Sequence, residues 1–445
     1  MTGWSLQDDP EPSGKNFRSS LHPRRPERVV AKNGAIPPID PRTKEQGRYA
    51  HPEGPKRPRP DREGALGMIR PRMREELYIN LNPLQRGGVV PAEGRKTAVA
   101  YIDGYSTCDY CPGTLHLMKK PPIQDFLKEV AEFLNMDTAT LTQGCREAKL
   151  IIMRSLTTPG QTILVDSNKH YTTQLAAELA GLEIVEIPNS GYPRFRIDPD
   201  GYLEAIRKVK KETGKPPALA LLTHVDWLYG NLVDAARVGE ICREHDVPFL
   251  LNTAYSSGRM SIDGKRVHAD FITCSGHKSW ATGGGTMGIL AMQSEWEKKV
   301  LKPSRHHELK PLELLGCTTR GTSALTLMAS FPTVKERVKI WREEVEKARW
   351  FSSQIESLGA VRQLGEKPHC HDLLRFETPV LHRIAQKHKR RGYYLYEELR
   401  KRKILGIKPG RTKSLDLSTY QLTKEQLNYV LDSFKDIVDK LSLKN

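Results

Sequence analysis

The stretch DFITCSGHKSWATGGGTMGIL, residues 270–290, is the part of the chain that says most about its fold. An apolar run leads directly into Ser275, His277 and Lys278, and three consecutive glycines follow. A lysine at the mouth of a sheet can be partly desolvated and can form a Schiff base with an aldehyde. Ser275 and His277 can hydrogen-bond a phosphate, and the glycines let the backbone turn closely beneath a ring. On its own, the motif fits a surface lysine beside a glycine-rich turn equally well.

Short apolar runs with polar ends precede this stretch and alternate with helical patterns. The runs are TILVDS (162–167), EIVEIP (183–188), ALALLTHVD (218–226), VPFLLNTA (247–254) and DFITCS (270–275). The segments between them, such as TTQLAAELAGL, GYLEAIRKVKKETG and ARVGEICREHD, have the spacing of helices. This alternation predicts an α/β fold with a mostly parallel sheet, whose strands carry function at their carboxyl ends.

Changes in composition divide the chain into three zones. Residues 1–75 are rich in Pro, Arg, Lys and Gly and have almost no apolar periodicity, so they cannot offset the entropy of ordering. We expect a basic, mobile extension there, which contacts RNA, or is a misassigned start or a simple solvated tail. Residues 76–330 are predicted to form the large α/β domain. Residues 331–445 are predicted to form a smaller C-terminal α/β domain, beginning with a long helical pattern over 333–359.

Further candidate groups follow predicted strands or open predicted helices. The run Gly144-Cys145-Arg146 starts a helical segment after the strand-like TATLTQ, and free backbone N–H groups at a helix start suit a phosphate. His170 follows the strand TILVDS and could lie flat on a pyridine ring. Asp226 and Asn252 stand at the carboxyl ends of two predicted parallel strands, where open α/β sheets bind ligands.

The composition indicates a basic intracellular protein. The formal net charge is +17 and the isoelectric point is near 9.4, which favours polyanionic partners over a merely solvated surface. No run of about eighteen apolar residues occurs, so we expect no membrane span. The N-terminus is polar and lacks the apolar core of a signal peptide, and a cytoplasmic location is therefore expected.

The chain has seven cysteines, an odd number that argues against a disulfide framework in a reducing compartment. Cys108 and Cys111 form a C-x-x-C motif in a loop bounded by Gly and Pro, typical of a redox pair or of half a zinc site. A second C-x-x-C is absent from the sequence, and Cys317 is a candidate third member. The remaining cysteines are interpreted as structural: Cys145, Cys242, Cys274 and Cys370.

The chain order of these groups resembles the fold-type I aminotransferase superfamily, and in particular its cysteine desulfurase branch. The resemblance is closer to the family of Sep-tRNA:Cys-tRNA synthases and covers most of residues 78–445. It rests on the segments INLNPLQRGG, YSTCDYCPG, THVDWLYGNLVD, LLNTAYSSGRM and SGHKSWATGGG. The resemblance implies a fold-type I PLP-dependent transferase with a large domain built on a mostly parallel sheet and a smaller C-terminal α/β domain.

The resemblance also implies roles for the candidate residues around pyridoxal 5′-phosphate. Lys278 would form the Schiff base, and His170 would stack on the ring. The cofactor phosphate would be held by Gly144, Cys145, Arg146, Ser275 and His277. Asp226 would lie near the ring hydroxyl and Asn252 near the pyridine nitrogen, where the desulfurases usually have an aspartate. Gly321 and Thr322 resemble the segment that reaches the cofactor phosphate of a second subunit, which implies a homodimer.

For the reaction, the resemblance implies that O-phosphoseryl-tRNA(Cys) loses phosphate and gains sulfur, with Lys278 as general base. Arg86, Arg146 and Tyr171 are candidates for binding the substrate phosphate, and Arg86 could equally be an ordinary surface arginine. Cys108, Cys111 and Cys317 would carry persulfide sulfur or ligate an iron–sulfur cluster, and both readings stay open. A sulfur donor and the phosphoseryl-tRNA synthetase are candidate partners.

Two other functions remain as alternatives. The first is an enzyme acting on free amino acids, such as a cysteine desulfurase or selenocysteine lyase, which the basic charge and the early C-x-x-C disfavour. The second is an inactive tRNA-binding scaffold that keeps the fold. The intact Ser275, His277 and Lys278 argue against the scaffold.

Overall fold

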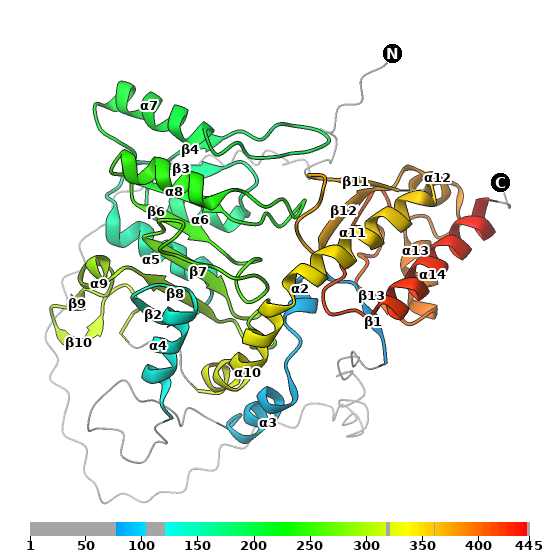
Figure 1. The fold of residues 1–445 in the computed structure, drawn as a ribbon, viewed down its shortest axis with the longest axis horizontal. Coiled ribbons are helices and arrows are strands. Elements are labelled where there is room, and N and C mark those ends of the chain that lie inside the picture. The colour runs from blue at the N-terminus through cyan, green and yellow to red at the C-terminus, as the bar shows by residue number, and fades with distance from the viewer. Residues whose placement is uncertain (1–76, 104–120, 317–320, 360, 443–445) are drawn as a thin grey trace, which may run out of the picture. The chain divides into compact units, whose positions relative to one another are not determined.

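The computed structural model describes residues 77–103, 121–316, 321–359 and 361–442. Within these ranges, a seven-stranded sheet with the order β2-β8-β7-β6-β5-β3-β4 forms the centre of the larger part (Figure 1). Strands β7, β6, β5, β3 and β4 run parallel, and β8 runs antiparallel to both of its neighbours. The strands are β2 (Thr138–Thr142), β3 (Thr162–Asp166), β4 (Glu183–Ile187), β5 (Leu219–Thr223), β6 (Phe249–Asn252), β7 (Phe271–Ser275) and β8 (Gly288–Met292). The predicted α/β fold with a mostly parallel sheet is confirmed.

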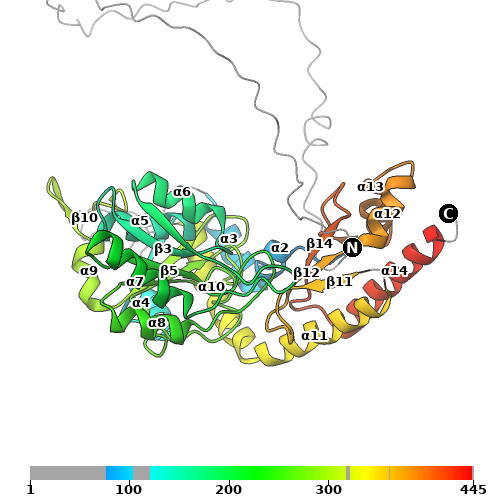
Figure 2. The same ribbon diagram turned by 90° about the horizontal axis from the view of Figure 1, so that it is seen from above.

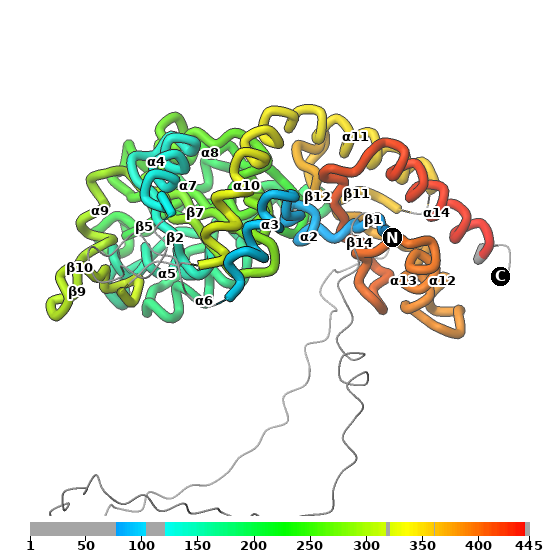
Figure 3. The backbone as a smooth tube through the Cα atoms, turned by 90° about the horizontal axis from the view of Figure 1, so that it is seen from below, coloured from blue at the N-terminus to red at the C-terminus, as the bar shows by residue number. Residues whose placement is uncertain are grey.

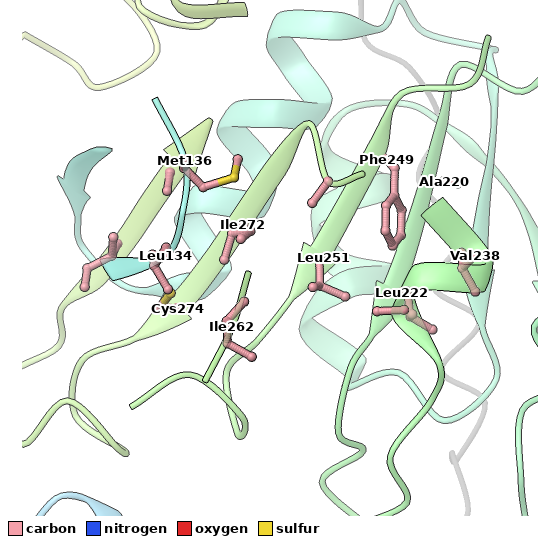
Figure 4. Packing of buried hydrophobic residues seen from close by; sticks show 14 of the residues in the cluster. Leu134, Met136, Ala220, Leu222, Val238, Phe249, Leu251, Ile262, Ile272 and Cys274 are labelled. Carbon is pink, nitrogen blue, oxygen red and sulfur yellow. The ribbon is translucent and has the colours of Figure 1, made fainter. Parts of the chain in front are cut away.

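The central strands are apolar throughout because helices cover both faces of the sheet. Successive side chains alternate between two buried clusters, so Leu251 faces one cluster and Leu250 the other. Figure 4 shows part of the first cluster, with Cys274 and Ile272 of β7 and with Leu251 of β6, which is the pairing partner of Ile272. Cys274 is therefore a core residue, as the sequence indicated.

Each face of the sheet has its own set of helices. One cluster includes side chains from α4 (Ile123–Phe133), α7 (Gly201–Thr213), α8 (Ala235–Glu244) and α10 (Thr322–Lys339). The other cluster includes side chains from α5 (Cys145–Leu156), α6 (Tyr171–Leu179) and α9 (Ser294–Val300). Local signals fix the helix ends: the Asp234 carboxylate caps α8, and left-handed Gly214 ends α7.

The C-terminal elements form a second packing unit around a three-stranded antiparallel sheet, β11-β12-β14 (Figure 2). Its strands are β11 (Arg362–Leu364), β12 (Leu373–Glu377) and β14 (Ser414–Ser418), and its helices are α11 (Trp341–Ser357), α12 (Pro379–Lys387), α13 (Tyr393–Lys401) and α14 (Lys424–Ser442). Strand β1 (Ile79–Asn80) pairs with β13 (Ile404–Leu405), and Leu81 packs in the C-terminal core. The remaining elements are α2 (Pro83–Gly87), α3 (Ala92–Ala100), β9 (Pro303–Ser304) and β10 (His307–Pro311).

The helical pattern over 333–359 divides into two helices, because α10 ends at Lys339 and α11 begins at Trp341. The expected domain boundary after residue 330 falls inside α10, whose Phe331 and Val334 pack against the large sheet. The extension expected for residues 1–75 lies outside the described residues. Among the helices that the structure describes, none is both long and apolar enough to cross a membrane.

A buried ion pair links the segment between β6 and β7 to the residue that precedes β12 of the C-terminal sheet. The side chains of Arg259 and Asp372 are fully buried and pair with each other. Arg259 Nε also donates to Ser279 Oγ at 2.9 Å, and the Ser418 hydroxyl donates to Asp372. A buried pair whose remaining polar atoms are also bonded fixes geometry, since removing either partner would leave an uncompensated charge. The backbone next to Lys278 is held in this way.

Candidate active site

A cavity lies where the parallel strands end. Thr223 of β5, Asn252 of β6 and Ser275 of β7 line it, together with the start of α5 and the segment containing Lys278. Strand register brings these ends together, because Asn252 pairs with Thr223 on one side and with Thr273 on the other. The cavity has about 870 Å³ of empty space, including its open mouth.

Lys278 is buried in this cavity beside an aromatic ring. Its Nζ lies 3.5 Å from the ring centroid of Tyr255. Burial lowers the pKa of Lys278 to about 7, and the positive charges of Arg259 and Lys149 act in the same direction. A large part of the Lys278 side chains in solution is therefore in the neutral, nucleophilic form near pH 7.

The glycine pair of LQRGG allows the N-terminal segment to approach this lysine. A Cβ on Gly87 would lie 3.1 Å from the Lys278 carbonyl oxygen and 2.8 Å from Arg259 Nη2. A Cβ on Gly88 would overlap the carbonyl oxygen of His277. The two glycines are needed because the backbones lie in direct contact, which explains why this motif accompanies the lysine motif.

The start of α5 forms an open cradle of backbone N–H groups. Gly144, the N-cap, has φ of 135°, and no side chain caps the helix. A Cβ added to Gly144 would meet no atom within 4 Å, so the space above the turn is open. Arg146 lines the same cavity, as do Ser275 and His277, whose Oγ and Nδ1 atoms lie 3.4 Å apart. Helix-start N–H groups, hydroxyls and a guanidinium match a phosphate.

A chain of hydrogen bonds fixes the protonation of His170. The Thr172 backbone N–H, which can only donate, is bonded to His170 Nδ1 at 3.3 Å. Lys149 Nζ donates to Thr172 Oγ1 at 3.0 Å, which leaves the Thr172 hydroxyl to donate to His170 Nδ1 at 3.0 Å. Nδ1 is therefore an acceptor, and the ring proton is on Nε2. Burial, and then the charges of Lys278, Lys149 and Arg146, lower the pKa of His170 to about 4.

The His170 ring contacts two aromatic side chains. Its centroid is 4.3 Å from the ring of Tyr171 and 5.4 Å from that of Trp227. Tyr171 is half exposed and lines the cavity mouth with Trp227. Behind them, Asn252 Oδ1 accepts from Cys145 Sγ at 3.3 Å and from the Ala254 N–H at 3.2 Å. Asn252 thereby ties the end of β6 to the start of α5.

Three predicted site residues do not line the cavity. The Asp226 carboxylate accepts from the backbone N–H groups of Leu228 and Asn231, and from that of Tyr229, and stabilises the turn after β5. Arg86 is buried, and its Nε donates to the Tyr420 carbonyl at 2.9 Å. The Thr322 hydroxyl donates to the Tyr101 carbonyl. The roles proposed for Asp226 and Arg86 thus receive no support from their positions, and the role of Thr322 toward a second subunit stays a prediction.

The predicted cysteine trio, Cys108, Cys111 and Cys317, lies outside the described residues. Within the described ranges, no group of three or more His, Cys, Asp or Glu side chains could hold a metal ion. Cys242 is buried, as expected, and Cys370 is partly exposed.

Sequence reasoning missed several residues of the cavity, including Lys149 and Tyr255. Lys149 is buried and lies one helical turn after Cys145 on α5. Because residues four apart share a face of a helix, the position of Cys145 in the predicted phosphate site could have pointed to Lys149. Tyr255, three residues after Asn252, contacts Lys278. Nothing in the local sequence marks this tyrosine, because the contact depends on how the loop after β6 folds.

The cavity fits pyridoxal phosphate on three observations. The start of α5 offers an open, uncapped anion cradle. Lys278 is buried without a carboxylate partner among the described residues. Thr223 Oγ1, which lines the cavity, is buried and has no hydrogen-bond partner among the described residues. A bound polar ligand would satisfy this hydroxyl.

Comparisons with known proteins agree with this geometry. The family model described as O-phosphoseryl-tRNA(Sec) selenium transferase, SepSecS, matches residues 153–438. The O-phospho-L-seryl-tRNA:Cys-tRNA synthase of Methanopyrus kandleri is 48% identical over 377 residues, covering 83% of this chain and 96% of the relative. That of Methanocaldococcus jannaschii is 50% identical over 363 residues, covering 81% and 96%.

Solved structures give the same result. The SepCysS chain in a complex with the SepCysE N-terminal domain is 47% identical, with a TM-score of 0.79, and the match covers 86% of this chain and all of that one. A cysteine desulfurase from Thermococcus onnurineus has a TM-score of 0.65 at 17% identity, covering 84% and 100%, which shows a shared fold. The chain therefore belongs to the SepSecS-type family and, within it, to the O-phospho-L-seryl-tRNA:Cys-tRNA synthases.

Proposed function

We propose that this chain converts O-phosphoseryl-tRNA(Cys) into cysteinyl-tRNA(Cys) with pyridoxal phosphate as cofactor. The observation that carries the proposal is the 48% identity over 377 residues to an O-phospho-L-seryl-tRNA:Cys-tRNA synthase. The buried lysine in the cavity supports it, as does the net charge of +17, which suits a substrate made mostly of RNA phosphate.

The cofactor would attach to Lys278. Its phosphate would be held by Gly144, Cys145, Arg146, Ser275 and His277. When bound, pyridoxal phosphate supplies an electron sink next to the substrate Cα and so weakens the Cα–H bond. Asn252 would lie toward the pyridine nitrogen, where an amide maintains a weaker sink than a carboxylate.

Two cavity residues, Lys278 and His170, would accept the substrate Cα proton and contact the cofactor ring, respectively. Lys278 has a pKa of about 7, so its neutral amine can accept the Cα proton near neutral pH. Neutral His170 presents Nε2–H as a donor and stays neutral, because its pKa is about 4. Arg146 and Tyr171 line the cavity and would bind the departing phosphate.

The cysteines at positions 108, 111 and 317 would hold the sulfur that is transferred to the substrate. Overall, the Cβ–O bond to phosphate breaks and a Cβ–S bond forms. With hydrosulfide as the source, inorganic phosphate is released and no electrons are transferred. A persulfide source would need two more electrons, which two thiols of the trio would supply by forming a disulfide. An iron–sulfur cluster on the trio remains the second form of this proposal.

The decisive experiment supplies the purified chain with pyridoxal phosphate, O-phosphoseryl-tRNA(Cys) and sulfide. Mass spectrometry of the hydrolysed aminoacyl group should detect cysteine and a stoichiometric release of phosphate. Conversion to selenocysteine with selenide, and none to cysteine with sulfide, would overturn the proposal in favour of selenium transfer.

The rival reaction is tested with free L-cysteine. A cysteine desulfurase would release alanine at a rate comparable to turnover of the charged tRNA, and this result would refute the proposed substrate. Iron and acid-labile sulfide analysis after anaerobic purification, compared with Cys108→Ala and Cys317→Ala variants, separates a cluster from a persulfide.

We also propose a homodimer in which Thr322 reaches the cofactor phosphate of the second subunit. Sedimentation velocity should give twice the mass of the 50.4 kDa chain. The solved complex of SepCysS with the SepCysE N-terminal domain supports an accessory partner, and the phosphoseryl-tRNA synthetase is a second candidate. Co-sedimentation with each protein tests these assemblies, and a monomer at all concentrations would contradict the shared site.

A further inference from the structure

Residues 382–413 are strongly basic, with twelve lysines and arginines against two glutamates. They include most of α12, all of α13, and the loop between β13 and β14. By comparison, α14 carries lysines and acidic residues in nearly equal numbers. Much of the net charge of +17 is therefore concentrated in one short segment of the C-terminal unit.

Five exposed cations of this segment form what we call the basic surface: Arg383, Lys387, Lys389, Arg391 and Lys413. None of the five side chains has a hydrogen bond or an ion pair with any residue that the structure describes. The two glutamates of the segment are already engaged, Glu397 by Arg390 and Glu398 by Lys401 and Arg402.

Packing contacts bring the parts of the basic surface together. Figure 3 shows α12 and α13 side by side, and their residues are in contact. The loop before β14 lies along the start of α12, because the Thr378 N–H donates to the Lys413 carbonyl at 3.0 Å. The charge of Lys413, after burial, lowers the pKa of His382 on α12. A Cβ on Gly392 would overlap the Gly410 carbonyl, so the two loops are in direct contact.

The turn between α12 and α13 is held in a defined shape. His388 Nδ1 accepts from the Arg390 N–H at 3.1 Å, and the His388 carbonyl accepts from the Arg391 N–H at 2.8 Å. Arg391 has a left-handed φ of 44°, which is uncommon for a residue other than glycine. On α12, Arg383 and Lys387 are one turn apart and share a face. The cations are therefore presented on an ordered framework, which reduces the entropy lost on binding.

We propose that the basic surface binds the phosphodiester backbone of the tRNA at a distance from the reacting aminoacyl end. The inference rests on the proposed function, because that function supplies the RNA. Unpaired cations spread over a helix face, a turn and a loop match a chain of regularly spaced phosphates. Tyr393, 56% exposed beside Gly410, adds an aromatic face on which a base can stack.

A matched pair of variants tests the proposal. One carries Arg383→Gln, Lys387→Gln, Lys389→Gln and Arg391→Gln. The control carries Arg207→Gln, Lys208→Gln, Lys210→Gln and Lys211→Gln on α7, where the four cations are also exposed and form no ion pair with any described residue. Both variants lose four positive charges, so a general effect of net charge is the same in both.

Affinity for a labelled, uncharged tRNA(Cys) transcript is measured by fluorescence anisotropy in the full holoenzyme at several salt concentrations. We expect the first variant to bind at least roughly ten-fold more weakly at ~0.1 M salt and its salt slope to fall by about 2–3, while the control changes less than about three-fold. Equal losses in both variants, or none in the first, would overturn the proposal. Unchanged cofactor absorbance and melting temperature show that the variants are folded.

Turnover of O-phosphoseryl-tRNA(Cys) separates this proposal from the proposed function. The first variant should raise KM and leave kcat unchanged. If the unmodified chain binds the transcript through this surface but makes no cysteinyl-tRNA, the proposed function fails and the surface stands. If turnover is normal and KM is the same in both variants, the proposal that the basic surface binds tRNA is refuted, and the proposed function is retained.

Discussion

The cavity and the basic surface use the same two residue types, lysine and arginine, in opposite surroundings. In the cavity, Lys278 and Lys149 are buried, and burial lowers the pKa of both. On the basic surface, Lys389 and Arg391 are exposed and hydrated. A buried charge depends on its individual neighbours, since water no longer screens them, whereas exposed charges act through their sum and are screened by salt. Single substitutions should therefore matter greatly in the first region and little in the second.

The largest effect is expected for Lys278→Ala, which removes both the attachment point and the proposed base. Turnover should fall by about 10³-fold or more, since a positioned base alone contributes roughly 10²–10⁴-fold. The cofactor should also be lost on gel filtration, which absorbance spectra would show. Lys298→Ala on α9, at an exposed lysine, is the control and should keep full activity. If Lys278→Ala retained activity comparable to this control, the cavity would not be the reaction site.

A smaller loss of turnover is expected when the hydrogen bonds that orient His170 are removed. Lys149→Met removes the donor to Thr172, and Thr172→Val removes the hydroxyl that donates to His170 Nδ1. We expect turnover to fall roughly ten- to hundred-fold in both, because small misplacements of a positioned group have effects of this size. The pKa of His170 should rise from about 4 in Lys149→Met, since a nearby positive charge has gone.

Nitrogen NMR of the histidine ring checks the tautomer directly. Unmodified protein should show the proton on Nε2 of His170, and Thr172→Val should keep it mainly there, because the backbone N–H of residue 172 still donates to Nδ1. Thr173→Val is the control, because the Thr173 hydroxyl accepts from Lys149 at 2.7 Å and has no contact with His170. A proton on Nδ1 in the unmodified protein would contradict the proposed direction of the hydrogen bonds.

The pH dependence of cofactor attachment should also separate the two regions. Only the neutral amine of Lys278 reacts, and its pKa is lowered to about 7. The attachment rate of the apoprotein should therefore rise about ten-fold per pH unit on the acid side and level off above pH ~7, whereas an exposed lysine would keep rising toward pH ~10. Stopped-flow absorbance measures this rate. A profile still rising steeply at pH 9 would show that burial does not lower this pKa.

Much of the fold could be predicted because buried parallel strands have a distinctive composition. The runs TILVDS, EIVEIP and DFITCS coincide with β3, β4 and β7, and the polar residue that ends the last of them, Ser275, lines the cavity. The sequence analysis did not distinguish strand β8 from the glycine-rich segment before it, because the apolar run there is too short to show a periodicity. The break at Ile340 was missed because apolar spacing continues across it.

Only those site residues that lie near recognisable strand ends could be predicted from the sequence. Lys278, His170 and Asn252 stand next to strand ends, and the structure places all three in the cavity. Asp226 satisfied the same rule, yet its carboxylate is used by a turn. Lys149 looked like an ordinary helical lysine. Which strand-end side chain faces the cavity depends on tertiary packing, and pattern alone does not encode it.

The smallest effect, on tRNA affinity, is expected for substitutions of single cations of the basic surface. These substitutions test most directly whether exposed cations behave differently from the buried lysines of the cavity. Lys389→Gln should weaken tRNA binding only about two- to five-fold and lower the salt slope by less than about one, since one phosphate contact is lost. Arg383→Gln should do the same, and the two free-energy changes should add, because exposed charges do not share buried neighbours. Titrations at three salt concentrations would measure both quantities. A single substitution that abolished binding would mean that this cation is buried in the complex, as Lys278 is in the cavity, and that the two regions follow the same rule.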